Sequence, residues 1–253
     1  MWRLLAYLIT ICCIIKVYPQ EKHQLFTEIL QQYVQDGKVD YENLKNDKRL
    51  DDYIKKLSDT HADTIVNNNK KFAFWINVYN AFTLKVICDN YPVKSIKDLN
   101  TGSSIVANLL NTTVWDRDLV VINNEKMTLN HVEHDIIRPE FNDPRAHFAL
   151  VCAAISCPPL RSEAYEGFKL DKQLDEQGRV FLNNPDQNNF LLDEKEAHLS
   201  KILDWYSQDF GKNDKDLLLY LSKFLPNQVA NSIISNAGDW KIKYNVYDWR
   251  LNE

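Results

Sequence analysis

Apolar side chains recur at helical spacing through much of the chain. In residues 21–36 they gather on one face, which predicts an amphipathic helix there. These side chains are Leu25, Ile29, Leu30 and Val34. Comparable patterns predict helices over residues 42–59, 169–183, 202–206, 217–224 and 227–234. The chain is therefore expected to be built mainly from helices.

Residues 70–90 have a different pattern, because apolar side chains occupy nearly every side of the predicted helix. Such a helix is buried in the middle of a protein. Its polar exceptions, Asn77 and Asn80, are three positions apart and share one face. Buried amides need hydrogen-bond partners. Asn77 and Asn80 therefore either hold neighbouring loops in a structural network or face a pocket and bind substrate.

Short β-strands are predicted farther along the chain. Asn123-Asn124 tolerate left-handed backbone geometry, and the extended stretches on either side predict a β-hairpin over residues 119–129. The apolar run His147–Cys152 predicts a short buried strand. Residues 190–199 predict a strand with a flanking loop, and the aromatic stretch 244–249 predicts a closing strand.

A further helix is expected over residues 131–138. Asn130 is placed to cap its N-terminus, Glu133 is placed to complete a capping box, and Pro139 is expected to end it. Glu133, His134 and Arg138 would supply an acid, a base and an anion clamp if this helix faces a site. An ordinary capped helix with a solvated face accounts for the same residues. His134 and Arg138 are therefore candidate substrate-binding residues.

The order of elements predicts an α+β fold in which helix predominates. Its small β-sheet would include the hairpin and the short central strand His147–Cys152. The chain has only six glycines, so few positions need a positive φ, which favours helix over a turn-rich sandwich. No long linker interrupts residues 21–253, which are expected to form one domain.

The first twenty residues have the pattern of a secretory signal peptide. Arg3 supplies a positive charge, and residues 4–17 are apolar except for Thr10 and Lys16. This apolar stretch is short for a membrane span. No small-x-small pattern precedes Glu21, so an uncleaved anchor is the alternative. The protein is expected to be secreted or periplasmic, or else anchored in the membrane by residues 4–17.

Charge and cysteine content narrow the function. A formal net charge of −5 with scattered lysines argues against nucleic-acid binding. Beyond residue 20 the cysteines are Cys88, Cys152 and Cys157. In an oxidising compartment this odd number leaves at least one thiol unpaired within the chain. Either Cys152 and Cys157 bridge a small loop, with Cys88 buried and inert, or all three stay reduced and one is reactive.

The leading candidate chemistry is a cysteine nucleophile, Cys152, with His147 as its base. The nucleophile is a thiolate, and a nearby imidazole accepts its proton. The two residues are five positions apart, so on one straight strand they would point to opposite faces. A direct pair needs a bend between them; otherwise Cys152 pairs with another histidine, such as His134. The structural alternatives are a small buried cysteine and a core histidine bound to a backbone carbonyl.

Other classes of site have little support in the sequence. His131 and His134 are a possible ligand pair, but the chain has no HExxH or CxxC motif. It also lacks a Gly-rich phosphate loop and a GxSxG elbow. No metal and no cofactor are therefore expected. The missing CxxC spacing also counts against a thiol–disulfide function of Cys152 and Cys157.

Five segments, taken together, carry a resemblance to a known family. They are Phe74–Ala81, His134–Pro139, His147–Cys152 with Ser156–Leu160, Leu199–Tyr206 and Tyr247–Asn252. In this order they resemble the domain-of-unknown-function family 547, over about residues 24 to 252. The resemblance implies the fold and no particular activity. It also implies that the counterparts of His147 and Cys152 persist in distant members while that of Cys157 is less regular, which favours Cys152 as the reactive residue over a 152–157 disulfide.

Three functions remain open at this point. The first is an exported thiol hydrolase or acyl-transfer enzyme that uses Cys152 and His147, with a site lined by Asn77, Asn80, His134 and Arg138. The second is a non-catalytic exported domain that binds a small molecule or peptide, which six tryptophans, twelve tyrosines and eleven phenylalanines favour. The third is a thiol–disulfide function of Cys152 and Cys157. Membrane contact is expected only through an uncleaved N-terminus, and the oligomeric state is left open.

Overall fold

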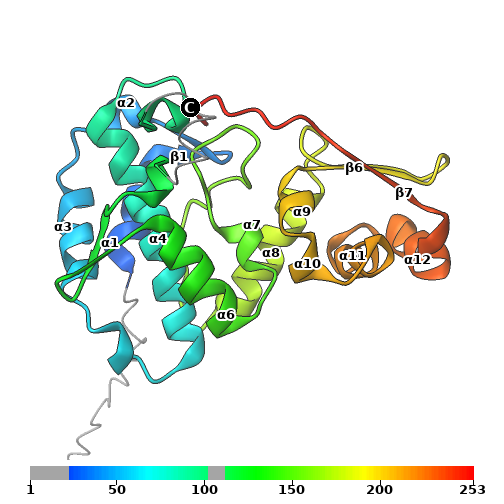
Figure 1. Ribbon diagram of the computed structural model, residues 1–253, viewed down its shortest axis with the longest axis horizontal. Helices are drawn as coiled ribbons and strands as arrows, with labels where there is room; N and C mark the ends of the chain where they lie inside the picture. The colour runs from blue at the N-terminus through cyan, green and yellow to red at the C-terminus, as the bar shows by residue number, and fades with distance from the viewer. Residues whose placement is uncertain (1–22, 102–111) are drawn as a thin grey trace, which may run out of the picture.

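The structure is a computed structural model that describes residues 23–101 and 112–253 (Figure 1). The predicted export segment, residues 1–20, lies outside the described residues, as does most of the short helix or loop that the sequence predicts over residues 103–115. Within the described ranges, no helix combines the length and the apolar character needed to cross a bilayer.

The N-terminal part surrounds one buried helix with shorter ones. It consists of α1 (Gln24–Tyr33), α2 (Tyr41–Leu44), α3 (Arg49–Ser58), η1 (Ala62–Thr64), α4 (Asn68–Asn90), η2 (Ile96–Leu99) and η3 (Val114–Asp116). Helices α2 and α3 pack on α4, which is buried along nearly all of its apolar stretch, as predicted. The helix predicted over residues 42–59 is interrupted, because Asp47 Oδ1 accepts the Arg49 amide at 3.0 Å and begins a new helix.

Two tight hairpins flank these helices. They are β1 (Val34–Gln35) with β2 (Lys38–Val39), and β3 (Val120–Ile122) with β4 (Glu125–Met127). In the second hairpin Asn123 and Asn124 have φ values of 51° and 64°. A two-residue turn of this hand matches the twist of the strands it joins. The hairpin predicted over residues 119–129 is confirmed.

The helix after this hairpin differs from the prediction at both ends. It contains a π-helical stretch, η4 (His131–Ile137), and continues as α6 (Arg138–Phe141), so that Pro139 lies in its last turn. Asn130 is not its cap, because its backbone is already helical and its amide donates to Asp116 Oδ1 at 2.6 Å. Glu133 is consequently not part of a capping box. Its side chain is buried, only 6% exposed.

The segment predicted as a central strand is a short helix. Residues Ala146–Ala149 form α7, and the chain becomes extended only from Leu150. The turn at residues 142–144 begins this helix, because the carbonyls of Asp143 and Pro144 accept the amides of residues 146 and 147. The predicted central strand is therefore wrong, whereas the predominance of helix in an α+β fold is confirmed.

The C-terminal part has its own sheet and its own hydrophobic cluster. After α8 (Leu170–Leu182), the sheet has the order β5 (Asn189–Leu191), β6 (Glu196–Leu199) and β7 (Lys241–Tyr244). The pair β5–β6 is antiparallel and β6–β7 is parallel. Between β6 and β7 lie α9 (Ile202–Trp205), α10 (Ser207–Phe210), α11 (Asp214–Leu221), η5 (Ser222–Phe224), α12 (Asn227–Asn236) and η6 (Ala237–Asp239). The closing strand predicted over 244–249 thus lies at 241–244.

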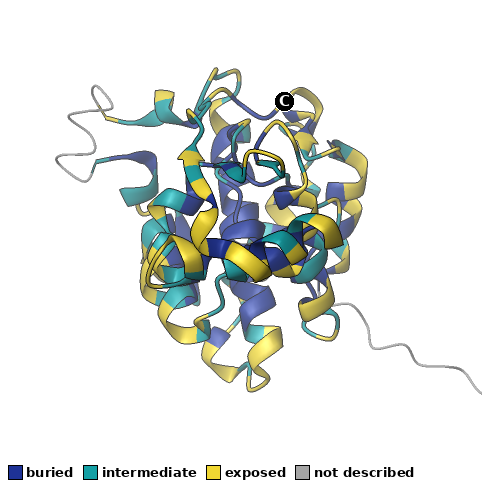
Figure 2. Cartoon of the chain, turned by 90° about the vertical axis from the view of Figure 1, so that its right-hand side faces the viewer, coloured by how far each residue is buried: buried dark blue, intermediate teal, exposed yellow. Residues whose placement is uncertain are grey.

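The last residues cross the molecule from β7 back to the first hairpin (Figure 1, red). On the way they bond to the loop of residues 153–156: the Ile155 amide donates to the Arg250 carbonyl at 2.8 Å. At the far end, the Asn252 carbonyl accepts the Val39 amide at 2.8 Å. Figure 2 shows buried segments gathered in the interior and exposed positions on the outer helix faces. Residues 245–252 therefore join the C-terminal part to the N-terminal helices.

Candidate functional site

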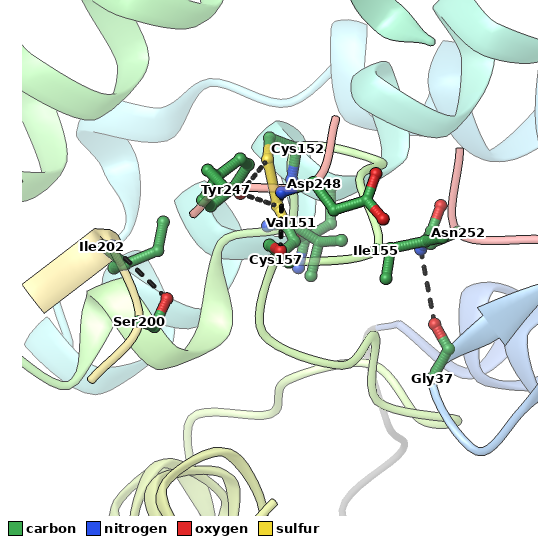
Figure 3. Close-up of a disulfide and its surroundings, with 12 residues drawn as sticks. Gly37, Val151, Cys152, Ile155, Cys157, Ser200, Ile202, Tyr247, Asp248 and Asn252 are labelled. Atoms are coloured by element: carbon green, nitrogen blue, oxygen red, sulfur yellow. Dashed lines mark hydrogen bonds between the residues drawn. A yellow bond between two sulfur atoms is a disulfide. The ribbon is translucent and has the colours of Figure 1, made fainter. Parts of the chain in front are cut away.

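Cys152 and Cys157 form a disulfide (Figure 3). The extended chain after α7 carries Cys152, and the loop of residues 153–156 returns Cys157 to it, with Ala153 at φ 58°. Cys152 is half-buried, whereas Cys157 is only 2% exposed. Of the two alternatives for the cysteines, the structure contains the bridge, and Cys152 is its more accessible end.

The Tyr247 hydroxyl lies against both sulfurs (Figure 3). Its Oη is 3.1 Å from Cys152 Sγ and 3.2 Å from Cys157 Sγ. Because disulfide sulfurs carry no hydrogen, the phenol is the donor. Burial raises the pKa of Tyr247 well above its usual range, and the charge of Glu133 acts in the same direction. Tyr247 therefore remains protonated at neutral pH and can donate to a sulfur that gains negative charge.

A cavity of about 280 Å³ borders the disulfide. Six aromatic side chains line it: Tyr79, Trp115, Trp205, Tyr206, Tyr247 and Trp249. Among the described residues, its ionisable neighbours besides tyrosine are Glu133 and His147, and both cysteines contribute to its wall. A cavity of this size and apolar character suits a small ligand fixed by a few polar groups.

Four of these rings form a continuous group, which we call the aromatic wall: Trp115, Trp205, Tyr247 and Trp249. The centroid of Trp249 lies 4.5 Å from that of Tyr247, 5.8 Å from Trp115 and 5.9 Å from Trp205. Trp205 is 47% exposed, which is unusual for so large an apolar side chain. Lys97 Nζ lies 3.9 Å from the centroid of Trp249, so the wall already interacts with one ammonium group.

His147 is held by an acid from the C-terminal part. Its Nε2 lies 2.7 Å from Asp209 Oδ2, and its ring stacks on Tyr206 at a centroid distance of 4.0 Å. Arg138 donates to both oxygens of the same carboxylate, at 2.7 and 2.8 Å. The hydrogen bond from His147, reinforced by Arg138, holds the pKa of Asp209 well below its usual range. The imidazole is thereby fixed in one orientation at the edge of the cavity.

The structure brings His147 and Cys152 to one cavity but does not form the predicted dyad. Among the described hydrogen bonds, the Cys152 sulfur contacts the Tyr247 hydroxyl, and the His147 ring contacts Asp209. In the disulfide state Cys152 also has no thiol to deprotonate. The bend that the pair requires is present, because α7 ends between the two residues.

Glu133 is the buried carboxylate of the cavity. The π-helical stretch η4 places it with Val132 and Ile137 on the buried face. Burial, together with the charge of Glu133, raises the pKa of Tyr79 and of Tyr206. Among the described residues, no lysine or arginine forms an ion pair with Glu133, whereas the nearby Arg138 is paired with Asp209. The cavity therefore contains an acid without a paired cation.

The buried amides of α4 serve the structural role. Asn77 donates to the Tyr165 carbonyl at 2.8 Å and accepts the Tyr165 amide at 2.9 Å. Asn80 donates to the Ala149 carbonyl and accepts the Val151 amide, both at 2.9 Å. Neither residue lines the cavity. The substrate-binding role predicted for Asn77 and Asn80 is not supported by their placement.

The other predicted substrate-binding residues also lie outside the cavity lining. His134 is exposed, and its Nδ1 lies 3.0 Å from Arg138 Nη1. Arg138 reaches the site indirectly, through Asp209 and His147.

Burial raises the pKa of the Cys88 thiol to about 12, which makes it unreactive at neutral pH. Within the described residues, no cluster of three or more His, Cys, Asp or Glu side chains is arranged to hold a metal ion.

Residues 64–182 match the sequence profile of a family described as "Protein of unknown function, DUF547". The predicted resemblance to family 547 is confirmed over these residues. Comparisons with curated proteins and with solved structures gave no significant match. The DUF547 match contains Tyr79, Glu133, His147 and both bridged cysteines. Trp205, Tyr206, Asp209, Tyr247 and Trp249 follow it in the sequence.

The sequence prediction missed most of the cavity wall. The aromatic wall comes from three distant segments, around residues 115, 205 and 247–249, and sequence spacing does not reveal such proximity. Three signals were available: the aromatic content of the chain, and the two segments Leu199–Tyr206 and Tyr247–Asn252 that resemble the DUF547 pattern. Asp209, the partner of His147, lies in a segment without a motif, so only the structure identifies it.

Proposed function

We propose that the chain is a thiol–disulfide exchange protein that acts on small thiols or disulfides bound in the cavity. The observation that carries the proposal is an accessible disulfide in the wall of an aromatic cavity. Cys152 is the accessible end and Cys157 the buried end, which suits attack at Cys152 and departure of Cys157. The Tyr247 hydroxyl is placed to stabilise the departing sulfur.

The exchange would proceed in two displacement steps. A substrate thiolate attacks Cys152 Sγ, the bond between Cys152 and Cys157 breaks, and Cys157 leaves with the electron pair as a thiolate. A second substrate thiolate then attacks the substrate sulfur of the mixed disulfide and releases Cys152 as a thiolate. Two substrate thiols are oxidised to one disulfide, and the protein gains their two electrons and two protons. A small disulfide returns the protein to its oxidised state by the reverse steps.

A pair of single-cysteine variants tests the assigned roles. In Cys157→Ser the thiol of Cys152 should react with hydroxyethyl disulfide roughly tenfold faster than the thiol of Cys157 does in Cys152→Ser, because only Cys152 is accessible. Both variants retain Cys88 as the same background. Adduct formation is followed by mass spectrometry on the native proteins. Equal rates, or reaction only after unfolding, would contradict the proposal.

A second candidate function is a thiol hydrolase that uses Cys152 as nucleophile and His147 as base. One observation favours it. The His147 imidazole is oriented by Asp209 at 2.7 Å and borders the same cavity as Cys152. After reduction, this arrangement offers a nucleophile, a base and an orienting acid. Reduced protein would then hydrolyse p-nitrophenyl esters, and Asp209→Asn would lower that rate. If Cys152→Ser hydrolyses the esters as fast as the reduced wild type, this candidate is removed.

We further propose that the chain is exported. The apolar stretch of residues 4–17 after Arg3 has the pattern of a signal peptide, and disulfides persist in oxidising compartments. Intact-mass analysis of protein expressed with its native N-terminus tests the proposal. Loss of about twenty residues, recovered outside the cytoplasm, is the expected result. Full-length protein in the membrane fraction would identify the segment as an anchor, and full-length protein in the cytoplasm would contradict export.

A further inference from the structure

The charge of the cavity points to the kind of thiol that it accepts. Glu133 is 6% exposed and lines the cavity, and Tyr79 and Tyr206 surround it with hydroxyls. Among the described residues, neither a lysine nor an arginine lines the cavity or pairs with Glu133. A buried carboxylate is costly unless a cation or hydrogen bonds compensate it. A positively charged ligand would complete that compensation.

The aromatic wall favours the same ligand. Ring faces attract organic cations, most strongly on tryptophan and in a site from which water is displaced. The wall contributes three tryptophans, and Lys97, whose Nζ lies 3.9 Å from the ring of Trp249, is not among the residues that line the cavity. A negatively charged ligand would meet Glu133 and the ring faces, both of which repel it. Both the carboxylate of Glu133 and the aromatic wall therefore favour a positively charged ligand in the cavity.

The disulfide and the carboxylate of Glu133 lie in the wall of the same small cavity. The Tyr247 hydroxyl lies 3.1 and 3.2 Å from the two sulfurs, and its ring belongs to the aromatic wall. Glu133 and the disulfide border the same cavity of about 280 Å³. A ligand that fills so small a space must carry its cation close to its sulfur. We infer that the cavity selects aminothiols and their disulfides, which are small molecules with a positively charged amino group near the sulfur.

This inference rests on the proposed thiol–disulfide function and names its substrate class. Three thiols of similar size test it. Cysteamine carries a positive charge, 2-mercaptoethanol is uncharged, and 3-mercaptopropionate carries a negative charge. Their rates of reducing the native disulfide are each divided by their rates with an oxidised peptide of residues 150–159. This normalisation removes the differences in intrinsic reactivity among the thiols.

The normalised rate should be roughly tenfold higher for cysteamine than for 3-mercaptopropionate, because one buried charge acts at short range. In Glu133→Gln the ratio should fall towards one. Glu194→Gln removes the same charge from an exposed turn and should keep the wild-type ratio. Equal normalised rates in the wild type would overturn the aminothiol inference while leaving the exchange function intact. If no thiol reduces the native disulfide faster than the peptide, the exchange function itself fails.

A measurement on the wild type does not depend on the folding of a variant. Propylammonium has the cation without a sulfur, so it should occupy the cavity and slow reduction by 2-mercaptoethanol. Propionate at the same concentration and ionic strength should leave that rate unchanged. Equal slowing by both ions, or slowing by neither, would contradict a cation-selective cavity.

Discussion

Asn80 shows how a single side chain can replace a neighbouring strand. Its amide group bonds to the Ala149 carbonyl and the Val151 amide, which a sheet partner would otherwise satisfy. The extended chain leading to Cys152 is thereby fixed on α4 without belonging to a sheet. For this reason the apolar run His147–Cys152, which was predicted as a strand, needs no neighbouring strand to satisfy these backbone groups.

Removing the Asn80 amide should therefore destabilise the fold. Asn80→Ala leaves a buried carbonyl and a buried amide without partners, and we expect a loss of about 2–4 kcal/mol in the free energy of unfolding. Asn90→Ala, at an exposed position near the end of the same helix, should cost less than about 1 kcal/mol. Urea unfolding of both variants measures the difference. Similar losses for the two would show that Asn80 is not the fixing residue.

Asp209 links stability to pH. Its pKa is lowered in the folded protein, so its stabilising contribution is complete above the unfolded pKa, near 4. That contribution is lost as the pH falls below about 4 towards the folded value. The difference in unfolding free energy between wild type and Asp209→Asn should be constant above about pH 5 and shrink towards pH 2. A difference that stays constant down to pH 2 would contradict the hydrogen bond with His147 and the ion pair with Arg138.

At the scale of elements, the sequence predicted helices and tight turns well, because their signals are local. The hydrophobic pattern located α1, α4 and α8, and Asn123-Asn124 located the turn between β3 and β4. The sequence-based prediction failed where a side chain makes a tertiary contact instead of the local capping interaction that was expected. Asn130 bonds to Asp116 and Glu133 enters the cavity, so neither caps the helix that follows the hairpin.

In the turn of the first hairpin, both the backbone conformation and the packing require glycine at position 37. Gly37 has φ 81°, and a Cβ at this position would overlap the side chain of Pro159. Gly37→Ala should therefore lower the free energy of unfolding by more than about 1 kcal/mol.

Gly238 provides the matched control for this prediction. A Cβ added there would have no heavy atom within 4 Å, and the residue has no positive φ, so Gly238→Ala should be neutral or stabilise by up to about 1 kcal/mol. Thermal unfolding of the two variants compares them directly. Equal midpoints would show that the turn tolerates a side chain at Gly37.

At the scale of the whole molecule, the last residues complete the site. Tyr247 and Trp249 belong to a segment that continues to Asn252, which bonds to Val39 and to the Tyr41 hydroxyl. The disulfide loop is bonded along the same segment. The DUF547 match supplies the disulfide, Glu133 and His147, and the chain after residue 182 closes the cavity over them.

Because the site is shared between the DUF547 match and the chain after residue 182, only part of it could be predicted from the sequence. Cys152 and His147 lie in one motif, so the sequence identified both. Their partners, Tyr247 and Asp209, lie 95 and 62 residues away and are brought to them only by tertiary packing. The resemblance favoured a reactive Cys152 over the disulfide that the structure contains, because the sequence does not reveal how residues 153–156 return Cys157 to Cys152.

The central claim is that the Cys152–Cys157 disulfide is open to small thiols in the folded protein. Native protein without residues 1–20 is treated with cysteamine, alkylated and mapped by mass spectrometry, while circular dichroism reports the fold. The account predicts alkylation at Cys152 first and more slowly at the buried Cys157, with Cys88 unlabelled and the fold intact. Free thiols at 152 and 157 before treatment, or reduction that occurs only in denaturant, would contradict it.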